Sequence, residues 1–275
     1  MIGLILSDLD GTLLRSDGKI SQRNLDAIRD AMCHGCIFAI ATGRYRSGCQ
    51  RVLEMLGLEE KDICCAYDNG AHVVCRGESI YDGSISRSDM RDIVHFLRDE
   101  ECTPALYIGK NWIVERKDSF FDSISAFYDG NGIIADFDDV LSNVDGSFSG
   151  PMKIAIRAVN EKMPGVYSRM MSKFPEYEYY LSNPTILEMN YIGKGKNNGL
   201  AILANHLGVD MKDTLAIGDY DNDAAMIRNA GVGVAMANAS MAAKAAADFI
   251  TLSNDEDGFA FAVEKFCLGG GAKRC

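Results

Sequence analysis

The chain has 275 residues, 47% of them hydrophobic and 24% charged, with a formal net charge of -11 at pH 7. This acidic balance argues against a surface that binds nucleic acid or an anionic membrane, so neither partner is expected. No cationic amino-terminal segment precedes an apolar stretch and no apolar run reaches bilayer length, which predicts a cytoplasmic protein.

The first predicted element is a buried strand over residues 2–6, which leads directly into an acidic loop. Its unbroken apolar run is typical of a central strand in a parallel sheet that is covered on both faces. Asp8 and Asp10 therefore follow the carboxyl end of the strand, where open α/β sheets have their binding crevice. Two carboxylates at this spacing repel each other unless a cation lies between them or one is protonated, whereas an ordinary Asp-Gly turn needs neither. The loop alone leaves both interpretations open.

A helix and a second buried strand follow, in the order that is typical of a parallel crossover. Ser21 is the predicted cap of the helix, and residues 36–41 form the strand. Because such crossovers are right-handed and parallel, Thr42 and Gly43 should lie on the same edge of the sheet as Asp8. The next predicted elements are a helix over residues 50–57, a strand over 63–67 and a hairpin over 68–75.

Residues 84–189 break this alternation and read as an inserted α+β domain. The predicted elements are a helix opened by Ser88, strands over 105–108 and 112–115, a helix over 120–128, a polar stretch over 136–150, a strand over 152–157, a helix with Pro164 in its first turn, and strands over 177–181 and 185–190. Such an order favours an antiparallel sheet with helices on one face. Trp112, Tyr177, Tyr179 and Tyr180 have the spacing of core residues, and lining of a pocket is the alternative.

The parallel pattern then resumes. The predicted elements are a helix over residues 197–207, a strand over 214–217, a loop over 218–223, a helix over 224–229, a strand over 232–235, a helix near 241, a strand over 249–251, a helix over 259–266 and a frayed tail over 269–275. The fold class is therefore α/β, a Rossmann-like parallel sheet core with an inserted α+β domain. The expected boundaries are 1–83 and 190–275 for the core and 84–189 for the insert.

The nine cysteines are expected to be reduced thiols, because their number is odd and the long chain has no export signal. Cys33 and Cys36 have the CxxC spacing of a zinc site, but no second pair of cysteine or histidine ligands completes one. These two residues are interpreted as packing around a turn. Cys64 and Cys65 are expected to pack as small hydrophobic residues in a strand.

Three further loops carry residues of the kinds that bind phosphate or metal. They are Thr42-Gly43-Arg44 after the second strand, residues 188–200 with Lys194 and Lys196, and Gly218-Asp219-Tyr220-Asp221-Asn222-Asp223 after an apolar strand. Each has an ordinary explanation when taken alone: a turn, a solvated lysine, and acids that cap a helix. Asp219 is the exception, because it occupies the strand-end position analogous to that of Asp8.

Together with Asp8-Leu9-Asp10-Gly11-Thr12-Leu13, these loops resemble the four motifs of the haloacid dehalogenase-like hydrolases, in the family's order. Residues 234–239 and 254–258 are similar to the Cof-type branch of that family, and the insert lies where that branch has its C2-type cap. Counting from Glu188 and Leu200 selects Lys196 over Lys194 as the phosphate lysine. The family normally has glycine after this lysine, whereas this chain has Asn197.

The resemblance implies a role for each motif residue. The catalytic residues are Asp8, Asp10, Thr42 and Lys196. The phosphate contacts are Leu9, Thr42, Gly43, Lys196 and Asn222. The metal contacts are Asp8, Asp10 through its backbone carbonyl, Asp219 and Asp223. Carboxylate, carbonyl and water oxygens make a hard ligand set that suits Mg²⁺ as the cofactor.

The implied function is a Mg²⁺-dependent phosphatase that hydrolyses small phosphorylated metabolites, such as sugar phosphates, through an aspartyl-phosphate on Asp8. One alternative is a phosphomutase or phosphotransferase acting on sugar phosphates. Another is a non-catalytic phospho-aspartate signalling module, against which an acid/base at Asp10 and a large insert both argue. The physiological substrate, the specificity residues of the insert and the oligomeric state are not predicted.

Overall fold

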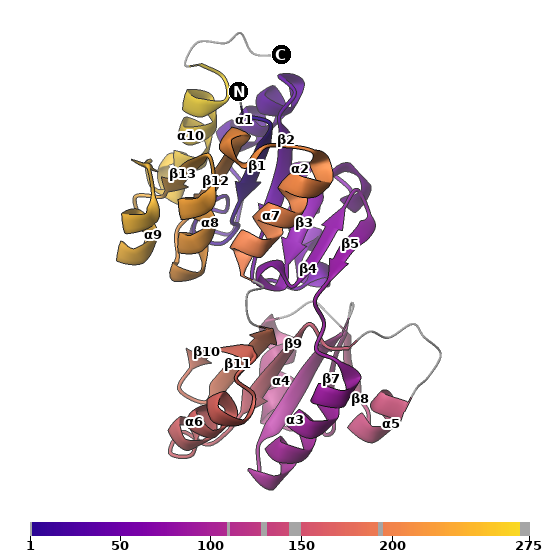
Figure 1. Ribbon diagram of the computed structural model, residues 1–275. Coiled ribbons are helices and arrows are strands. Elements are labelled where there is room, and N and C mark those ends of the chain that lie inside the picture. Colours follow the sequence, from indigo (N-terminus) through magenta and orange to yellow (C-terminus); the bar gives the residue numbers. More distant parts are fainter. Residues whose placement is uncertain (1, 109–110, 128–130, 143–149, 192–194, 270–275) are drawn as a thin grey trace. The chain divides into compact units, whose positions relative to one another are not determined.

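The computed structural model describes residues 2–108, 111–127, 131–142, 150–191 and 195–269, and the chain forms two units (Figure 1). The first unit consists of residues 1–44, 51–81 and 194–275, and the second of residues 45–50 and 82–193. Lys194, Tyr128, residues 143–149 of the predicted polar stretch and nearly all of the predicted tail lie outside the described residues. Residues 45–50, which the expected boundaries assign to the core, belong to the second unit.

The first unit is built on one eight-stranded sheet with the order β14-β13-β12-β1-β2-β3-β4-β5. Its strands are β1 (Leu4–Ser7), β2 (Ile37–Ala41), β3 (Cys64–Tyr67), β4 (His72–Cys75), β5 (Glu78–Asp82), β12 (Thr214–Gly218), β13 (Val232–Ala235) and β14 (Phe249–Ile250). Strands β14 to β3 pair in parallel, and β4 is antiparallel to β3. The central β1 is buried along its whole length, which explains its unbroken apolar sequence.

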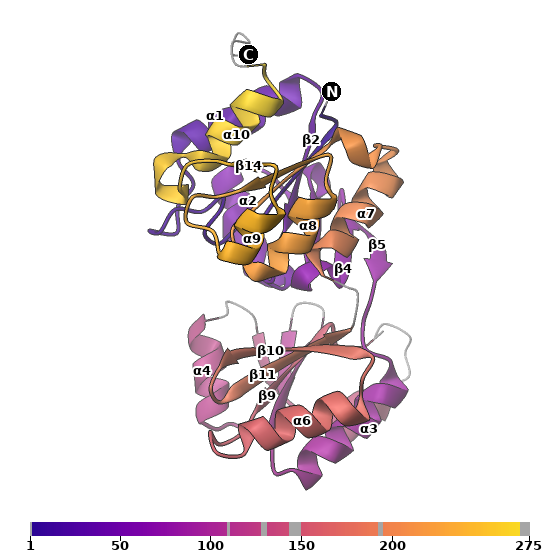
Figure 2. The same ribbon diagram turned by 60° about the vertical axis from the view of Figure 1, so that its left-hand side comes forward.

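Helices cover both faces of this sheet. They are α1 (Gln22–Cys33), α2 (Gln50–Leu56), α7 (Lys196–Leu207), α8 (Ala224–Asn229), α9 (Met241–Ala246) and α10 (Gly258–Phe266). On one face Leu4 and Leu6 share a core cluster with Leu200 of α7 and Met226 of α8. On the other, α1 and α10 lie side by side (Figure 2). The parallel strands therefore end on a common edge, as a doubly wound sheet requires.

Short 3-10 turns connect several of these elements. They are Arg46–Cys49, Glu60–Asp62, Asp68–Gly70, Met211–Asp213, Asp221–Asp223 and Asn254–Glu256. Ser21 caps α1 as predicted, since its side chain accepts a hydrogen bond from the backbone N–H of Asn24 at 3.1 Å.

The second unit contains a six-stranded mixed sheet with the order β10-β11-β9-β6-β7-β8. Its strands are β6 (Thr103–Ile108), β7 (Asn111–Val114), β8 (Asn131–Ile134), β9 (Lys153–Arg157), β10 (Tyr177–Asn183) and β11 (Ile186–Tyr191). Its helices are α3 (Arg87–Asp99), α4 (Ser119–Phe127), α5 (Phe137–Ser142) and α6 (Met163–Lys173). All the strand pairs are antiparallel except β7 with β8.

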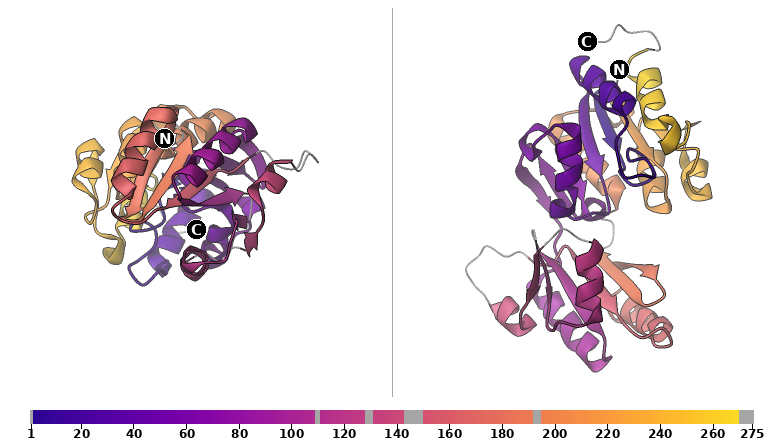
Figure 3. Two further views of the ribbon diagram at one scale, coloured as in Figure 1. Left: turned by 90° about the horizontal axis from the view of Figure 1, so that it is seen from below. Right: turned by 180° about the vertical axis from the view of Figure 1, so that it is seen from behind.

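The prediction that the helices of this unit lie on one face of its sheet is wrong. The core cluster on one face contains residues of α3, α5 and α6. Phe120 and Ile124 of α4 instead pack with Trp112 and Ala155 on the opposite face, where a view from behind shows α4 in front of the sheet (Figure 3, right). Strands β5 and β8 and helix α5 were not predicted, and Ser86, not Ser88, caps α3.

The expectation that all cysteines are reduced is also wrong. Cys64 of β3 and Cys75 of β4 face each other directly in the antiparallel pair, with their Cα atoms 4.0 Å apart, and they form a disulfide. This pairing follows from the hairpin register, which a cysteine count does not reveal. Cys33 is exposed and Cys36 is buried, as free thiols.

None of the helices among the described residues combines the length and the apolar character that crossing a bilayer requires. Of the four aromatic residues singled out in the insert, Trp112 and Tyr177 are buried core residues, Tyr179 is partly buried and Tyr180 is exposed.

Candidate active site

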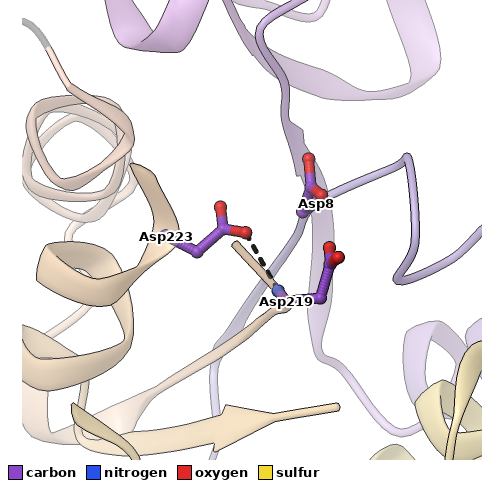
Figure 4. A group of neighbouring side chains, drawn as sticks. All are labelled: Asp8, Asp219 and Asp223. Carbon is purple, nitrogen blue, oxygen red and sulfur yellow. Dashed lines mark hydrogen bonds between the residues drawn. The ribbon is translucent and has the colours of Figure 1, made fainter. Parts of the chain in front are cut away.

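Three aspartates meet at the edge where the parallel strands of the first unit end (Figure 4). Asp8 follows β1 and Asp219 follows β12, and because Ser7 pairs with Ile217 the two strands end at the same level. Asp223 reaches the same point from the turn before α8. One carboxylate oxygen of each aspartate lies within 4.8 Å of the others, so parallel strand pairing brings together residues more than 200 positions apart.

Lys196, the first residue of α7, lies between two of these carboxylates. Its Nζ donates hydrogen bonds to Asp8 Oδ1 at 2.6 Å and to Asp223 Oδ1 at 2.7 Å, and the lysine side chain is 2% exposed. Asp223 Oδ2 in turn accepts from the backbone N–H groups of Asp219 and Tyr220, at 2.9 and 3.0 Å. Asp223 is therefore fixed from both sides and positions the lysine.

The charges in this cluster strongly perturb one another. Burial raises the pKa of Asp8 well above its usual value, and Lys196 opposes that effect while Asp223 adds to it. Burial would lower the pKa of Lys196, but Asp8 and Asp223 together outweigh it and raise that pKa. Burial also raises the pKa of Asp219. One ammonium group thus faces three carboxylates, and the excess negative charge favours a bound cation.

The donor set of this cluster fits a hard divalent cation. Asp8, Asp219 and Asp223 offer only carboxylate oxygens, the ligand type that Mg²⁺ prefers, and Asp219 is the least buried of the three. Lys196 occupies one oxygen each of Asp8 and Asp223, and the other oxygen of Asp223 accepts two backbone hydrogen bonds. Asp219 and the second oxygen of Asp8 are therefore the better placed ligands for the ion.

Gly11 gives Asp219 the room it needs. The glycine has a φ of +82°, and a Cβ at this position would lie 2.4 Å from Asp219 Oδ2. Thr12 donates from Oγ1 to Asp219 Oδ1 at 2.9 Å, and the side chain of Asn238 donates to the carbonyl of Gly11 at 2.8 Å. The acidic loop is therefore shaped around Asp219, and any larger residue at position 11 would displace that carboxylate.

Asp10 does not belong to the buried cluster. Its carboxylate is 60% exposed and accepts two hydrogen bonds from Arg44, from Nε at 2.8 Å and from Nη2 at 2.5 Å. The guanidinium group of Arg44 thus holds both carboxylate oxygens of Asp10 in a fork. Arg44 belongs to the second motif, so this ion pair joins the loop after β1 to the loop after β2.

The remaining predicted phosphate contacts lie on the loops after β2 and β12. Thr42 is buried, and its Oγ1 accepts a hydrogen bond from the backbone N–H of Arg44 at 3.1 Å. A Cβ on Gly43 would lie 3.3 Å from Asn69 Oδ1, the atom to which Asn222 donates at 2.9 Å. Gly43 and Asn222 thus both lie next to the side chain of Asn69.

The conformations of Leu9 and Asn69 limit how the loops after β1, β2 and β3 can contact phosphate. The side chain of Leu9 is fully buried, so only its backbone can contact a ligand. Asn69 has the left-handed backbone conformation, with a φ of 55°, and its N–H donates to the carbonyl of Thr42 at 2.9 Å. The sequence holds a local signal for Asn69, because this residue lies in a turn directly after the third parallel strand. Thr12 and Asn238 have no such signal, since their contacts arise only from the tertiary structure.

Comparison with known proteins extends over nearly the whole chain. The sequence profile of the haloacid dehalogenase-like hydrolase family matches residues 5–263. The 5-amino-6-(5-phospho-D-ribitylamino)uracil phosphatase YcsE of Bacillus subtilis is 31% identical over 269 residues, which cover 97% of this chain and 96% of the relative. The chloroplastic endoribonuclease YBEY of Arabidopsis thaliana is 29% identical over 96% of this chain, which spans 46% of that longer protein.

Solved structures of the same family also match this chain over most of its length. The crystal structure of a haloacid dehalogenase-like hydrolase from Bacteroides thetaiotaomicron matches with a TM-score of 0.82 and 30% sequence identity. The match covers 96% of this chain and 99% of that chain, so it includes both units.

Proposed function

Since the chain belongs to the haloacid dehalogenase-like hydrolases and is a phosphatase of their Cof type, we propose that it hydrolyses phosphorylated polyols and sugars through an aspartyl-phosphate formed on Asp8. The observation that carries this proposal is the contact of Lys196 with Asp8 and Asp223, which assembles a nucleophile and a phosphate-binding cation at one point. The fold class agrees with the prediction from the sequence. As a phosphatase of this family, the protein acts on small phosphorylated molecules.

In the first step, a carboxylate oxygen of Asp8 forms a bond to phosphorus and the bond from phosphorus to the ester oxygen breaks. Asp10 donates a proton to the departing oxygen, which leaves as an alcohol. Lys196, Thr42 and the backbone N–H groups of the loops stabilise the negative charge that develops on the phosphoryl oxygens.

In the second step, a water oxygen forms a bond to the phosphorus of the aspartyl-phosphate, and the bond to Asp8 breaks. Asp10, now unprotonated, accepts a proton from that water. Inorganic phosphate leaves, and both aspartates return to their starting protonation states. The fork of Arg44 suits the unprotonated carboxylate of Asp10, which is the form that accepts the proton of the attacking water.

Mg²⁺ is the proposed cofactor. Asp8, Asp219 and Asp223, together with the backbone carbonyl of Asp10, would hold it, and it would offset the repulsion between the carboxylates and an anionic phosphate. The Bacillus relative is named for a substrate in which the phosphate is attached to a ribityl chain. This name supports phosphorylated polyols as the first substrates to test. A phosphotransferase remains the second candidate, because both reactions share the intermediate on Asp8.

The test is phosphate release from ribitol 5-phosphate and glucose 6-phosphate, with and without Mg²⁺, in the wild type and in Asp8→Asn. Activity that requires both Mg²⁺ and Asp8 supports the proposal. Asp17→Asn, which changes an exposed aspartate of the same loop region, is the matched control and should retain activity. Hydrolysis by Asp8→Asn at the wild-type rate would exclude Asp8 as the nucleophile, and transfer to added glucose at the expense of water would identify a phosphotransferase.

A further inference from the structure

The segment between β13 and α9 contacts both loops that carry the aspartates of the proposed metal site. The side chain of Asn238 donates to the carbonyl of Gly11, one residue after Asp10, at 2.8 Å. Two positions further along the segment, the backbone N–H of Ser240 donates to the carbonyl of Asp219 at 2.8 Å. One short segment therefore holds the loop after β1 and the loop after β12 at the same time.

The amide of Asn238 is fixed in one orientation. Its Oδ1 accepts a hydrogen bond from the backbone N–H of Asn254 at 3.0 Å, and its Nδ2 faces the carbonyl of Gly11. A backbone N–H only donates and a carbonyl only accepts, so the two partners determine which way the amide points. Asn254 is buried, and its own side chain donates to the carbonyl of Leu14 at 2.9 Å. Two linked asparagines thus hold the acidic loop, one at Gly11 and one at Leu14.

The contact at Gly11 extends to the carboxylate of Asp219. The peptide group between Gly11 and Thr12 is planar, so a hydrogen bond to its carbonyl also fixes its N–H, which donates to the carbonyl of Leu9 at 3.3 Å. Thr12 Oγ1 in turn donates to Asp219 Oδ1 at 2.9 Å. Rotation of this peptide would draw the Thr12 hydroxyl away from Asp219. Asn238 is therefore one peptide group and one side chain away from a carboxylate of the site.

Asn238 makes these contacts with an exposed side chain. An exposed hydrogen bond contributes little to the stability of a fold, because water replaces it when it is lost. The buried Asn254 contrasts with it, since a lost partner there leaves a polar group away from water. The contact between Asn238 and Gly11 therefore bears on the shape of the acidic loop more than on the stability of the unit.

We propose that Asn238 is a positioning residue of the metal site, which holds the loops of Asp8 and Asp219 at the separation that Mg²⁺ requires and Ca²⁺ does not. The role assigned to Asn238 rests on the proposed function, because it assumes the Mg²⁺ site at these aspartates. Mg²⁺ demands oxygen ligands at about 2.0–2.1 Å in a near-ideal octahedron, whereas Ca²⁺ accepts about 2.3–2.6 Å and a flexible geometry. A site whose two loops are free to move apart loses affinity for Mg²⁺ more than for Ca²⁺.

The main test is Asn238→Ala, with the binding of each metal measured by calorimetry. The ratio of the Mg²⁺ to the Ca²⁺ association constant should fall by a factor of about 3 to 10, the order by which the loss of one hydrogen bond changes an equilibrium. The melting temperature of the metal-free protein should change little, because the side chain is exposed. Asn229→Ala is the matched control, since Asn229 is also an exposed asparagine of the first unit and donates to Asn197 Oδ1 at 3.0 Å. It should leave the ratio unchanged.

Two further variants separate the position of the loop from charge and from stability. Asn238→Asp keeps the acceptor for the N–H of Asn254 but has no N–H to donate to Gly11. Its added charge favours both cations alike, so the ratio should still fall as it does in Asn238→Ala. Ser21→Ala removes the cap of α1 and should lower the melting temperature while the ratio stays at its wild-type value.

Metal binding requires no catalysis, so the role of Asn238 and the proposed function can fail separately. A ratio that is the same in the wild type and in both Asn238 variants would overturn the positioning role and leave the proposed function intact. A ratio that depends on Asn238 in a protein that hydrolyses no phosphate ester would support the positioning role and overturn the proposed function. A wild type that binds no Mg²⁺ would overturn both.

Discussion

Lys196 Nζ donates to Asp8 Oδ1 over 2.6 Å, although 188 positions separate the two residues in the sequence. The contact joins the first strand of the chain to a helix that begins after the insert. Both side chains are buried, and the lysine also bonds to Asp223. The integrity of the first unit and the charge of the proposed nucleophile therefore depend on the same ammonium group.

Replacement of Lys196 by methionine should strongly destabilise the protein. The variant retains Asp8 and Asp223 as buried carboxylates without their counter-ion, and breaking a buried pair in this way typically costs about 3–5 kcal/mol. Urea unfolding measures the loss. Added Mg²⁺ should recover part of it, because a cation at the three aspartates supplies the missing positive charge and binds only the folded state.

Lys212→Met is the control for that experiment, because Lys212 is an exposed lysine paired with Asp210 in the same unit. It should unfold at nearly the wild-type urea concentration, with no response to Mg²⁺ beyond that of the wild type. Equal stability of the two lysine variants would contradict the buried arrangement of Lys196.

Gly11→Ala should weaken the binding of Mg²⁺ and the activity that depends on it. The new Cβ would lie 2.4 Å from Asp219 Oδ2, so the carboxylate must move out of the cluster. Gly18→Ala is a close control, because Gly18 also has a positive φ, of +75°, but no atom within 4 Å of its would-be Cβ. Both alanines cost backbone strain of about 1–2 kcal/mol. Only Gly11→Ala should raise the Mg²⁺ concentration needed for half-maximal activity, by about tenfold or more.

A titration of phosphate release against Mg²⁺ measures this difference. Identical titration curves for the two glycine variants would show that Asp219 does not hold the ion.

The fold was largely predictable because its central strands are covered on both faces. The apolar runs that became β1, β2 and β12 have no polar alternation, and a strand of this kind has few alternatives to the middle of a parallel sheet. The predicted fold class is confirmed. Strand β5 was missed because its burial is low along its whole length, so it carries no hydrophobic signal.

The candidate site was also predictable only in part from the sequence. The proximity of Asp8 to Asp219 follows from two strand ends on one edge, which local sequence and parallel topology together predict. The contact between Asp10 and Arg44 does not follow, because the direction of an exposed side chain depends on which loops meet above the strands.

The disulfide between Cys64 and Cys75 should make the stability of the protein depend on the redox state of the medium. It closes a loop with a sequence separation of 11, for which the loss of chain entropy on cross-linking corresponds to about 3 kcal/mol. The melting temperature of the wild type should therefore fall when a reducing agent is added. Thiol titration of the unfolded protein should find two more thiols after reduction than before.

Two cysteine variants, one in β3 and one in β4, distinguish the contribution of the disulfide to stability from the effects of other thiols. Cys75→Ala should abolish the response of the melting temperature to the reducing agent. Cys65→Ala removes a buried cysteine that is not part of the disulfide and should retain that response. A wild-type melting temperature that is the same in both media would indicate that Cys64 and Cys75 are reduced in solution.

Arg44→Gln should slow turnover more than it weakens substrate binding. Without the guanidinium fork, Asp10 is free to rotate into solvent, and an acid/base residue that is out of position loses part of the 10²–10⁴-fold contribution that such residues make. We expect kcat to fall about 10-fold to 100-fold while KM changes less. The kcat of Arg44→Lys should lie between those of Arg44→Gln and the wild type, because lysine keeps the charge but not the fork.

Arg51→Gln is the control, because it changes an exposed arginine nearby and should leave kcat within about twofold of the wild type. Steady-state kinetics on ribitol 5-phosphate measures all three variants, and a kcat for Arg44→Gln that matches that of Arg51→Gln would show that Asp10 acts without the support of Arg44.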